Sequence, residues 1–339
     1  MPPRRAYNGT SMIAPIGILG LGSYVPTRIM SNADWAQRVD TSDEWILERS
    51  GIRERRFAAD GETTVDLGEH AARAALADAG LRADQLDEIV VATDTPEVYC
   101  PDTAAYLQHR LGAREVPAYD LAGSGCAGFL QALDVARARA QVADKRILVC
   151  GIELISRLLD WTDRNTCVLF GDGAGAAVIG PSEGGPALVE FVMGTDGGRA
   201  DILGRTCGGT RMPFTLEAAQ TGRHLTVQMD GREVFKEAVH RMTEAARAVL
   251  DRAHVRLEEI ALFVPHQANR RILDSVTKQL GCPEEKVFCN IELLGNTGSA
   301  SIPIALVQAR AEGRIKPGDL VLCAAFGAGF HWGAAVIRF

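Results

Sequence analysis

Short runs of apolar residues recur along the chain, and longer segments with helical periodicity separate them. Three runs, at residues 89–92, 147–150 and 176–179, contain only isoleucine, leucine, valine, alanine and cysteine. Continuous apolar runs of this length predict strands that are covered on both faces of a sheet. Segments 103–111 and 127–142 have the spacing of helices instead. This alternation favours an α/β sandwich over an all-α or all-β fold.

The apolar pattern repeats once along the chain. Residues 86–91, 107–112 and 147–150 resemble residues 257–262, 276–281 and 320–323, each at an offset of about 170 positions. Three matches in the same order indicate two halves of similar fold. We expect an N-terminal half at 14–183 and a C-terminal half at 184–339, joined near Pro181–Pro186, where glycine and proline interrupt the pattern. Residues 1–13 are polar and predict a flexible extension.

Composition excludes several classes of protein. The chain has 339 residues, of which 47% are hydrophobic and 23% charged, as in an ordinary globular protein. Its net charge of −7 argues against a general nucleic-acid binder. Apolar runs stay shorter than the roughly 18 residues of a membrane helix, and the N-terminus lacks a signal-peptide layout. We therefore expect a cytoplasmic protein that binds neither nucleic acid nor membrane.

The eight cysteines are scattered, none forms a C-x-x-C pair, and histidines do not cluster near them. This distribution predicts reduced thiols and no metal site. One of them, Cys126, stands in Asp120-Leu-Ala-Gly-Ser-Gly-Cys126-Ala-Gly-Phe-Leu, which runs from a predicted strand through a glycine-rich turn into a helix. The helix dipole and free amides there would lower the thiol pKa from about 8.5. On this pattern alone, a buried structural cysteine is an alternative.

Two polar segments of the second half also precede predicted helices. His266 lies in Phe263-Val-Pro-His-Gln-Ala-Asn269, and Asn296 lies in Leu294-Gly-Asn-Thr-Gly-Ser-Ala-Ser301. Each residue alone fits a structural role, the histidine as a helix cap and the asparagine as a turn residue.

Together with further motifs, these segments resemble the β-ketoacyl-acyl-carrier-protein synthase III family of the thiolase superfamily. The resemblance spans Gly17 to Phe339 and includes Thr41-Ser-Asp-Glu-Trp45-Ile, Phe170-Gly-Asp-Gly-Ala-Gly-Ala-Ala-Val178, Gly313-Arg-Ile-Lys-Pro-Gly318 and Phe326-Gly-Ala-Gly-Phe-His-Trp-Gly333. It implies an α/β fold, the thiolase-like five-layer αβαβα sandwich built from two similar halves.

The resemblance also implies a reaction, the first condensation of fatty acid synthesis. Cys126 would take an acyl group from acyl-CoA, and His266 and Asn296 would donate hydrogen bonds to malonyl-acyl carrier protein as carbon dioxide leaves. Backbone N–H groups of Cys126 and Ala328 would form the oxyanion hole. Elongating synthases carry a second histidine at the position of Asn296, so this pairing indicates the initiating, CoA-primed type. No cofactor is implied beyond the coenzyme A thioester as substrate, and a homodimer is expected.

Further positions follow from the same resemblance. Trp45 and Arg164 would hold the adenine of CoA between them. The other CoA contacts expected are Arg49, Gly231, Phe235 and Asn269. The expected acyl pocket comprises Cys100, Leu169 and Phe326. A basic patch for the carrier protein, with a solvated charged face as its alternative, would comprise Lys236, Arg270, Arg271 and Lys278.

Departures from the family pattern keep other functions open. Cys100 is smaller than the aromatic residue that is frequent in the family at this position, which predicts a roomier primer pocket. Gly125 replaces an alanine, a change that we expect to be minor, and Ala328 replaces the middle glycine of the oxyanion loop. One alternative is a related acyltransferase or condensing enzyme of specialised metabolism with an unusual starter or acceptor. The other, from a different class, is a non-catalytic acyl-CoA or carrier-binding protein on the same scaffold.

Overall fold

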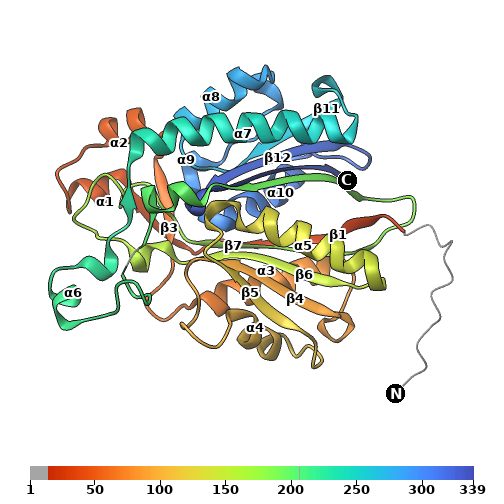
Figure 1. Cartoon of the computed structure of the whole chain (residues 1–339), viewed down its shortest axis with the longest axis horizontal. Helices are drawn as coiled ribbons and strands as arrows, with labels where there is room; N and C mark the ends of the chain where they lie inside the picture. The colour runs from red at the N-terminus through yellow and green to blue at the C-terminus, as the bar shows by residue number, and fades with distance from the viewer. Residues whose placement is uncertain (1–13, 206) are drawn as a thin grey trace.

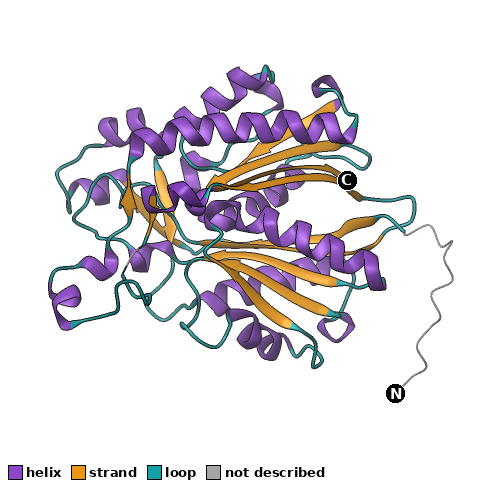
Figure 2. Ribbon diagram, viewed as in Figure 1, coloured by secondary structure: helices purple, strands orange, loops and turns teal. Residues whose placement is uncertain are grey.

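The protein contains two stacked mixed sheets, seen in a computed structural model that describes residues 14–205 and 207–339 (Figures 1 and 2). The expected extension at residues 1–13 lies outside the described residues. The first sheet has the order β1-β7-β6-β4-β5, with bounds Ile16–Tyr24, Gly173–Pro181, Ile147–Glu153, Glu88–Thr93 and Ala118–Ala122. The second has the order β11-β12-β13-β8, with bounds Ile260–Pro265, Leu320–Gly327, His331–Arg338 and Ala187–Thr195.

Helices form three further layers around and between the sheets. The outer face of the first sheet packs on α3 (Thr64–Asp78) and α4 (Thr103–Leu111). The outer face of the second packs on α7 (Gly231–Ala253) and α8 (Arg270–Leu280). Between the sheets lie α5 (Gly128–Ala143) and α10 (Ser301–Ala311). The result is the predicted thiolase-like five-layer sandwich.

Shorter elements border these layers. The strands are β2 (Arg28–Ser31), β3 (Glu54–Phe57), β9 (Leu203–Gly204) and β10 (Gln228–Met229). The helices are α1 (Asn32–Ala36), α2 (Asp43–Ser50), α6 (Leu216–Gln220) and α9 (Ile291–Leu294).

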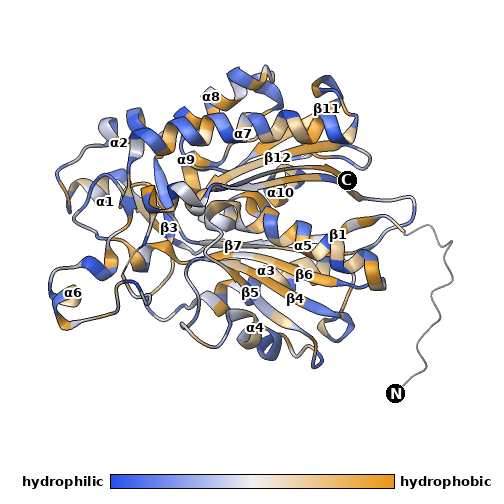
Figure 3. Cartoon of the chain, in the orientation of Figure 1, coloured by the Kyte–Doolittle hydropathy of each residue, from blue (hydrophilic) through white to orange (hydrophobic). Residues whose placement is uncertain are grey.

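The apolar runs of the sequence fill the interfaces between layers. Residues 89–92, 147–150 and 176–179 lie in β4, β6 and β7, whose side chains are buried, as predicted. The central strands are accordingly coloured hydrophobic in Figure 3. Burying a leucine or valine side chain contributes about 1.5–3 kcal/mol, so the three apolar clusters stabilise the stacking.

The two sheets have corresponding strand orders, which explains the sequence repeat. In the first, β4 lies beside β6, and in the second, β11 lies beside β12, in both cases parallel. A single bridge pairs Phe263 of β11 with Val287, at the position that β5 occupies beside β4. The segment 182–186 connects the two sheets, where glycine and proline were expected to break the pattern.

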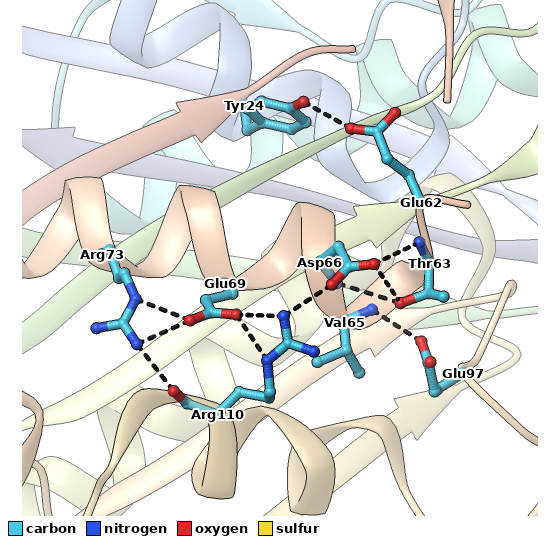
Figure 4. Close-up of polar contacts among 9 residues, drawn as sticks. All are labelled: Tyr24, Glu62, Thr63, Val65, Asp66, Glu69, Arg73, Glu97 and Arg110. Carbon is cyan, nitrogen blue, oxygen red and sulfur yellow. Dashed lines mark hydrogen bonds and ion pairs between the residues drawn. The ribbon is translucent and has the colours of Figure 1, made fainter. Parts of the chain in front are cut away.

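The loop after β4 is fastened to the beginning of α3 (Figure 4). The Glu97 carboxylate accepts a hydrogen bond from the backbone N–H of Val65 at 2.9 Å. The Thr64 hydroxyl donates a hydrogen bond to the carbonyl oxygen of Thr95 at 2.6 Å. Next to them, Arg110 of α4 donates to carboxylates of α3, to Asp66 and Glu69, both at 2.8 Å. The loop therefore has a fixed position relative to the helices that cover the first sheet.

All eight cysteines, which lie in the described part of the chain, are free thiols, as predicted. Within residues 14–205 and 207–339, no cluster of three or more histidine, cysteine or acidic side chains could hold a metal ion. None of the helices described here combines the length and apolarity required to cross a bilayer.

Candidate active site

Cys126 lies where the sequence predicts, in a single 3₁₀ turn (Gly125–Ala127) that leads into α5. Its side chain is half-buried and lines a cavity of about 1020 Å³. His266 and Asn296, from the second half of the chain, line the same cavity. The fold thus brings together three side chains that are remote in sequence.

The turn that carries Cys126 touches the loop after β12. Gly125 has φ +55°, and a Cβ added there would lie 2.4 Å from the amide nitrogen of Ala328. A Cβ added at Gly327 would lie 2.3 Å from the amide nitrogen of Cys126. Only glycines allow this approach. Glycine at position 125, where the family often has alanine, is therefore a structural requirement in this chain and not the minor change that we expected. Ala328 lies outside the positive-φ region, so its position does not need a glycine.

Asn296 faces the nucleophile with its orientation fixed by the backbone. Its Oδ1 accepts the N–H of Gly298 at 2.9 Å and lies 4.0 Å from the Cys126 Sγ. Because the oxygen is held by these donors, the amide NH₂ is available to a molecule in the cavity.

His266 is buried and held as a neutral hydrogen-bond donor. Its Nδ1 lies 2.6 Å from the hydroxyl of Ser301, the first residue of α10, and its backbone N–H donates to the carbonyl of Ala324 at 2.8 Å. Burial lowers the pKa of His266 to about 3. Within the described residues the Ser301 hydroxyl has no other acceptor, so it donates to Nδ1 and leaves the imidazole proton on Nε2.

The pKa of the Cys126 thiol is raised, contrary to the lowering expected at the helix terminus. Burial raises the pKa of Cys126 above its usual value, and the charges of Asp94 and Glu153 raise it further. Desolvation of the sulfur outweighs the favourable field of α5. The sequence pattern indicates that Cys126 stands at a helix terminus, but it does not indicate that the sulfur is buried.

These two carboxyl groups are site residues that the sequence analysis missed. Asp94 directly follows β4 and lines the cavity, and Glu153 is the last residue of β6 and is buried. A signal for Asp94 existed, because polar residues after the carboxyl end of parallel strands commonly face a ligand site. The same signal applied to Glu153, because it stands at the carboxyl end of β6, which is parallel to β4.

A second cavity, of about 420 Å³, lies beside the first and contains Trp45. Arg49, Gly231 and Asn269 line both cavities, so the two adjoin. The guanidinium carbon of Arg164 lies 5.1 Å, and that of Arg49 5.7 Å, from the centroid of the Trp45 ring. The cavity that contains Cys126 therefore adjoins a second one bordered by aromatic and cationic side chains.

Two other residues predicted to contact CoA, Phe235 and Asn269, differ in how free their side chains are to bind a ligand. Phe235 lines the larger cavity, and the guanidinium carbon of Arg271 lies 5.9 Å from the centroid of its ring. Asn269 caps α8, since its Oδ1 accepts the N–H of Arg271 at 2.9 Å and its Nδ2 donates to the carbonyl of Arg49 at 3.0 Å. Most of its hydrogen-bonding capacity thus serves the local structure.

The predicted acyl pocket is only partly assembled within one chain. Leu169 and Phe326 line the main cavity, but Cys100 is exposed and lies outside its lining. The expected basic patch is exposed on α7 and α8, where Arg270 pairs with Asp274 at 2.7 Å. The patch comprises Lys236, Arg270, Arg271 and Lys278.

The five-layer fold, with a cysteine at the beginning of a central helix and a histidine and an asparagine facing it, defines a condensing enzyme of the thiolase type. Comparison with known proteins gives the particular family. A family model described as 3-oxoacyl-[acyl-carrier-protein (ACP)] synthase III matches residues 119–197, and its C-terminal counterpart matches residues 250–339. The chain belongs to the β-ketoacyl-[acyl-carrier-protein] synthase III family.

Individual relatives match over nearly the whole chain. The β-ketoacyl-[acyl-carrier-protein] synthase III of Oleidesulfovibrio alaskensis is 46% identical over 325 residues, which cover 95% of this chain and 98% of the relative. The solved synthase III structure from Thermus thermophilus is 45% identical, with a TM-score of 0.89, and the match covers 95% of this chain and 99% of that one. The priming β-ketosynthase from the R1128 polyketide biosynthetic pathway is 35% identical, with a TM-score of 0.86 and 98% coverage of both chains.

Proposed function

We propose that this protein joins an acyl group from acyl-CoA to the two-carbon unit of malonyl-acyl carrier protein, with loss of carbon dioxide, as the first condensation of fatty acid synthesis. The observation that carries the proposal is the convergence of Cys126, His266 and Asn296 on one cavity, which adjoins the cavity lined by Trp45. Family membership supports the same reaction.

In the first half-reaction, the Cys126 sulfur attacks the thioester carbonyl of acyl-CoA and releases the CoA thiol. The oxyanion of the tetrahedral intermediate accepts hydrogen bonds from the amides of Cys126 and Ala328. The contact between their two loops supports this role, since Gly125 and Gly327 allow the amides to lie close together. Removing one such donor typically costs about 10²–10³ in rate.

In the second half-reaction, malonyl-carrier protein enters the same route. The Nε2–H of His266 and the amide of Asn296 donate to its thioester oxygen, which becomes negatively charged as carbon dioxide leaves. The resulting enolate attacks the acyl group on Cys126, a carbon–carbon bond forms, and the sulfur leaves. A neutral histidine suits this task because it is required to donate and not to accept a proton.

We further propose that the enzyme is a homodimer, with the halves 14–183 and 184–339 in each subunit. The neighbours of Cys100 support this, because Val98 and Tyr99 are apolar yet 41% and 86% exposed in the single chain. In a dimer, the segment 98–100 would close the acyl pocket of the partner, and the small Cys100 would leave room for a primer larger than acetyl. The patch on α7 and α8 is our candidate for binding of the acidic carrier protein.

The deciding experiment follows both half-reactions by intact-protein mass. The wild type is incubated with acetyl-, isobutyryl- and longer acyl-CoAs, and Cys126→Ser is the control that cannot form a thioester. Malonyl-acyl carrier protein is then added, and β-ketoacyl product is measured. Acylation that Cys126→Ser removes, followed by condensation, supports the proposal. Absence of acylation favours a binding protein, and acylation without condensation favours an acyltransferase with another acceptor.

A further inference from the structure

Arg55, in β3, is a fully buried arginine that has no part in the reaction described above. Its Nη1 donates to the Asn32 Oδ1 at 2.7 Å and to the carbonyl oxygen of Met30 at 3.3 Å, and its Nη2 donates to the carbonyl oxygen of Val168. All three acceptors are neutral, and burial lowers the pKa of Arg55 to about 10. A cation buried among neutral groups costs free energy, so packing alone does not account for an arginine at this position.

The segment 168–172, which begins at the acceptor of Nη2, holds the backbone of Asn296. The N–H of Asn296 donates to the carbonyl oxygen of Leu169 at 2.9 Å. The N–H of Gly171 donates to the carbonyl oxygen of Asn296, also at 2.9 Å. These two bonds form a parallel β-bridge between Phe170 and Asn296. Both backbone polar groups of Asn296 are therefore bound to this segment.

The aliphatic part of Arg55 packs where this segment meets the chain that leads into Asn296. A Cβ added to Gly171 would lie 3.2 Å from the Cβ of Arg55, and a Cβ added to Gly295 would lie at the same distance. The absence of side chains at these two positions lets the arginine contact both backbones at once. Arg55 thus packs beside the bridge as well as donating to the segment that forms it.

The two ends of the segment are attached to β3 in different ways. At the far end, the N–H of Asp172 donates to the carbonyl oxygen of Arg56 at 2.8 Å, a bond between main-chain atoms. At the near end, the attachment to Val168 is made by the side chain of Arg55. The planar guanidinium presents donors on separate edges, so it can bind Asn32 and Val168 simultaneously, which a lysine ammonium does less well. A substitution of Arg55 therefore releases one end of the segment and leaves the other in place.

We propose that Arg55 is a positioning residue for the condensation half-reaction. By holding the segment 168–172, it fixes the backbone from which the amide of Asn296 reaches the thioester oxygen of malonyl-acyl carrier protein. Acyl transfer to Cys126 does not use this amide and therefore does not depend on Arg55. This inference rests on the proposed function, because it assigns a residue to the second half of that reaction.

The test compares Arg55→Met with the wild type in single-turnover kinetics of each half-reaction. Condensation, measured from enzyme that is already acylated, should slow by about 10²-fold, as expected when a catalytic group is displaced by about 1 Å. Acylation by acetyl-CoA should change no more than a few fold. Arg55→Lys, which keeps a donor and the charge, should recover part of the condensation rate. Arg56→Met is the matched control, because this side chain lies on the opposite face of β3, pairs with Glu54 at 3.1 Å, and its loss leaves the main-chain bond intact.

A double substitution distinguishes positioning from a general structural role. In Asn296→Ala enzyme, Arg55→Met should slow condensation no further, because the amide that Arg55 positions is gone. If Arg55→Met does not fold, Arg55→Lys serves in the same comparisons.

The inference is overturned if the Arg55 variant condenses as fast as the wild type, if both half-reactions decline together, or if the losses from Arg55 and Asn296 multiply in the double variant. A loss in Arg56→Met as large as that in Arg55→Met would overturn it as well. A wild type that forms the acyl-enzyme but no condensation product would contradict the proposed function itself, so the two failures are distinguishable.

Discussion

The Nδ1 atom of His266 lies 2.6 Å from the hydroxyl oxygen of Ser301, although the two residues are 35 positions apart in the sequence. Strand β11 ends just before the histidine, and α10 begins at the serine. A residue at the beginning of a central helix therefore determines which nitrogen of the imidazole carries the proton.

Ser301→Ala should selectively impair condensation. Without the hydroxyl, nothing keeps the proton on Nε2, and we expect the condensation rate to fall about tenfold, since one hydrogen bond typically contributes about 0.5–1.5 kcal/mol. Acylation of Cys126 should change little. The measurement is single-turnover kinetics of each half-reaction, with Ser275→Ala on the exposed side of α8 as the control. Equal losses in both half-reactions would contradict this role.

Asn296→Ala should separate the half-reactions more strongly. The amide is required only when charge develops on the malonyl thioester oxygen, so condensation should fall about 10²–10³-fold while acyl transfer continues. Product formation from pre-acylated enzyme measures the first rate, and intact mass measures the second. If both half-reactions proceed unchanged, Asn296 has another task.

Trp45→Ala should weaken binding of the CoA nucleotide without affecting the chemistry. Stacking of a base on an aromatic ring contributes about 1–3 kcal/mol, so KM for acyl-CoA should rise roughly tenfold at unchanged kcat. Acyl-pantetheine lacks the adenine and provides an internal control, since wild type and variant should use it equally. A similar rise in KM for acyl-pantetheine would show that Trp45 maintains the structure of the site and does not bind the adenine.

Gly125→Ala should destabilise the protein beyond the cost of a positive φ. The new Cβ would lie 2.4 Å from the Ala328 nitrogen, so the two loops would have to separate. Gly112→Ala is the matched control, because Gly112 has φ +69° but nothing lies within 4 Å of its added Cβ. In urea unfolding, we expect Gly125→Ala to lose about 1–3 kcal/mol and Gly112→Ala less. Equal losses would show that the loops tolerate separation.

Glu153 should make stability depend on pH in a defined direction. Its pKa is raised to about 8 in the folded protein, against an ordinary value of 4.5, so the folded state binds the extra proton. The stabilisation is complete below pH 4.5 and is lost as pH rises through about 8. Glu153→Gln removes this dependence. Between pH 5 and pH 9, the unfolding free energy of the wild type should therefore fall relative to that of Glu153→Gln. A difference between the two proteins that stays constant with pH would contradict the raised pKa of Glu153.

The local pattern of the sequence predicts the buried strands, whereas the three central site residues are indicated only by the resemblance of the whole set of motifs to a known family. Buried strands such as β4 and β6 are continuous apolar runs, and Cys126, His266 and Asn296 each stand in a distinctive turn before a helix. The direction of the Cys126 pKa shift was predicted wrongly, because the burial and the acidic groups that raise it come from distant segments. Glu153 was missed for a similar reason, since its surroundings come from distant segments, among them Ser299, 146 positions away, whose hydroxyl donates to its carboxyl group.

The internal duplication places the beginnings of α5 and α10 side by side, with Cys126 in front of one and Asn296 in front of the other. Each helix start carries roughly half a unit of positive charge from its aligned peptide groups. Two copies of one architecture thus focus two such fields on a single spot, where the sulfur and the enolate must each bear negative charge for a moment.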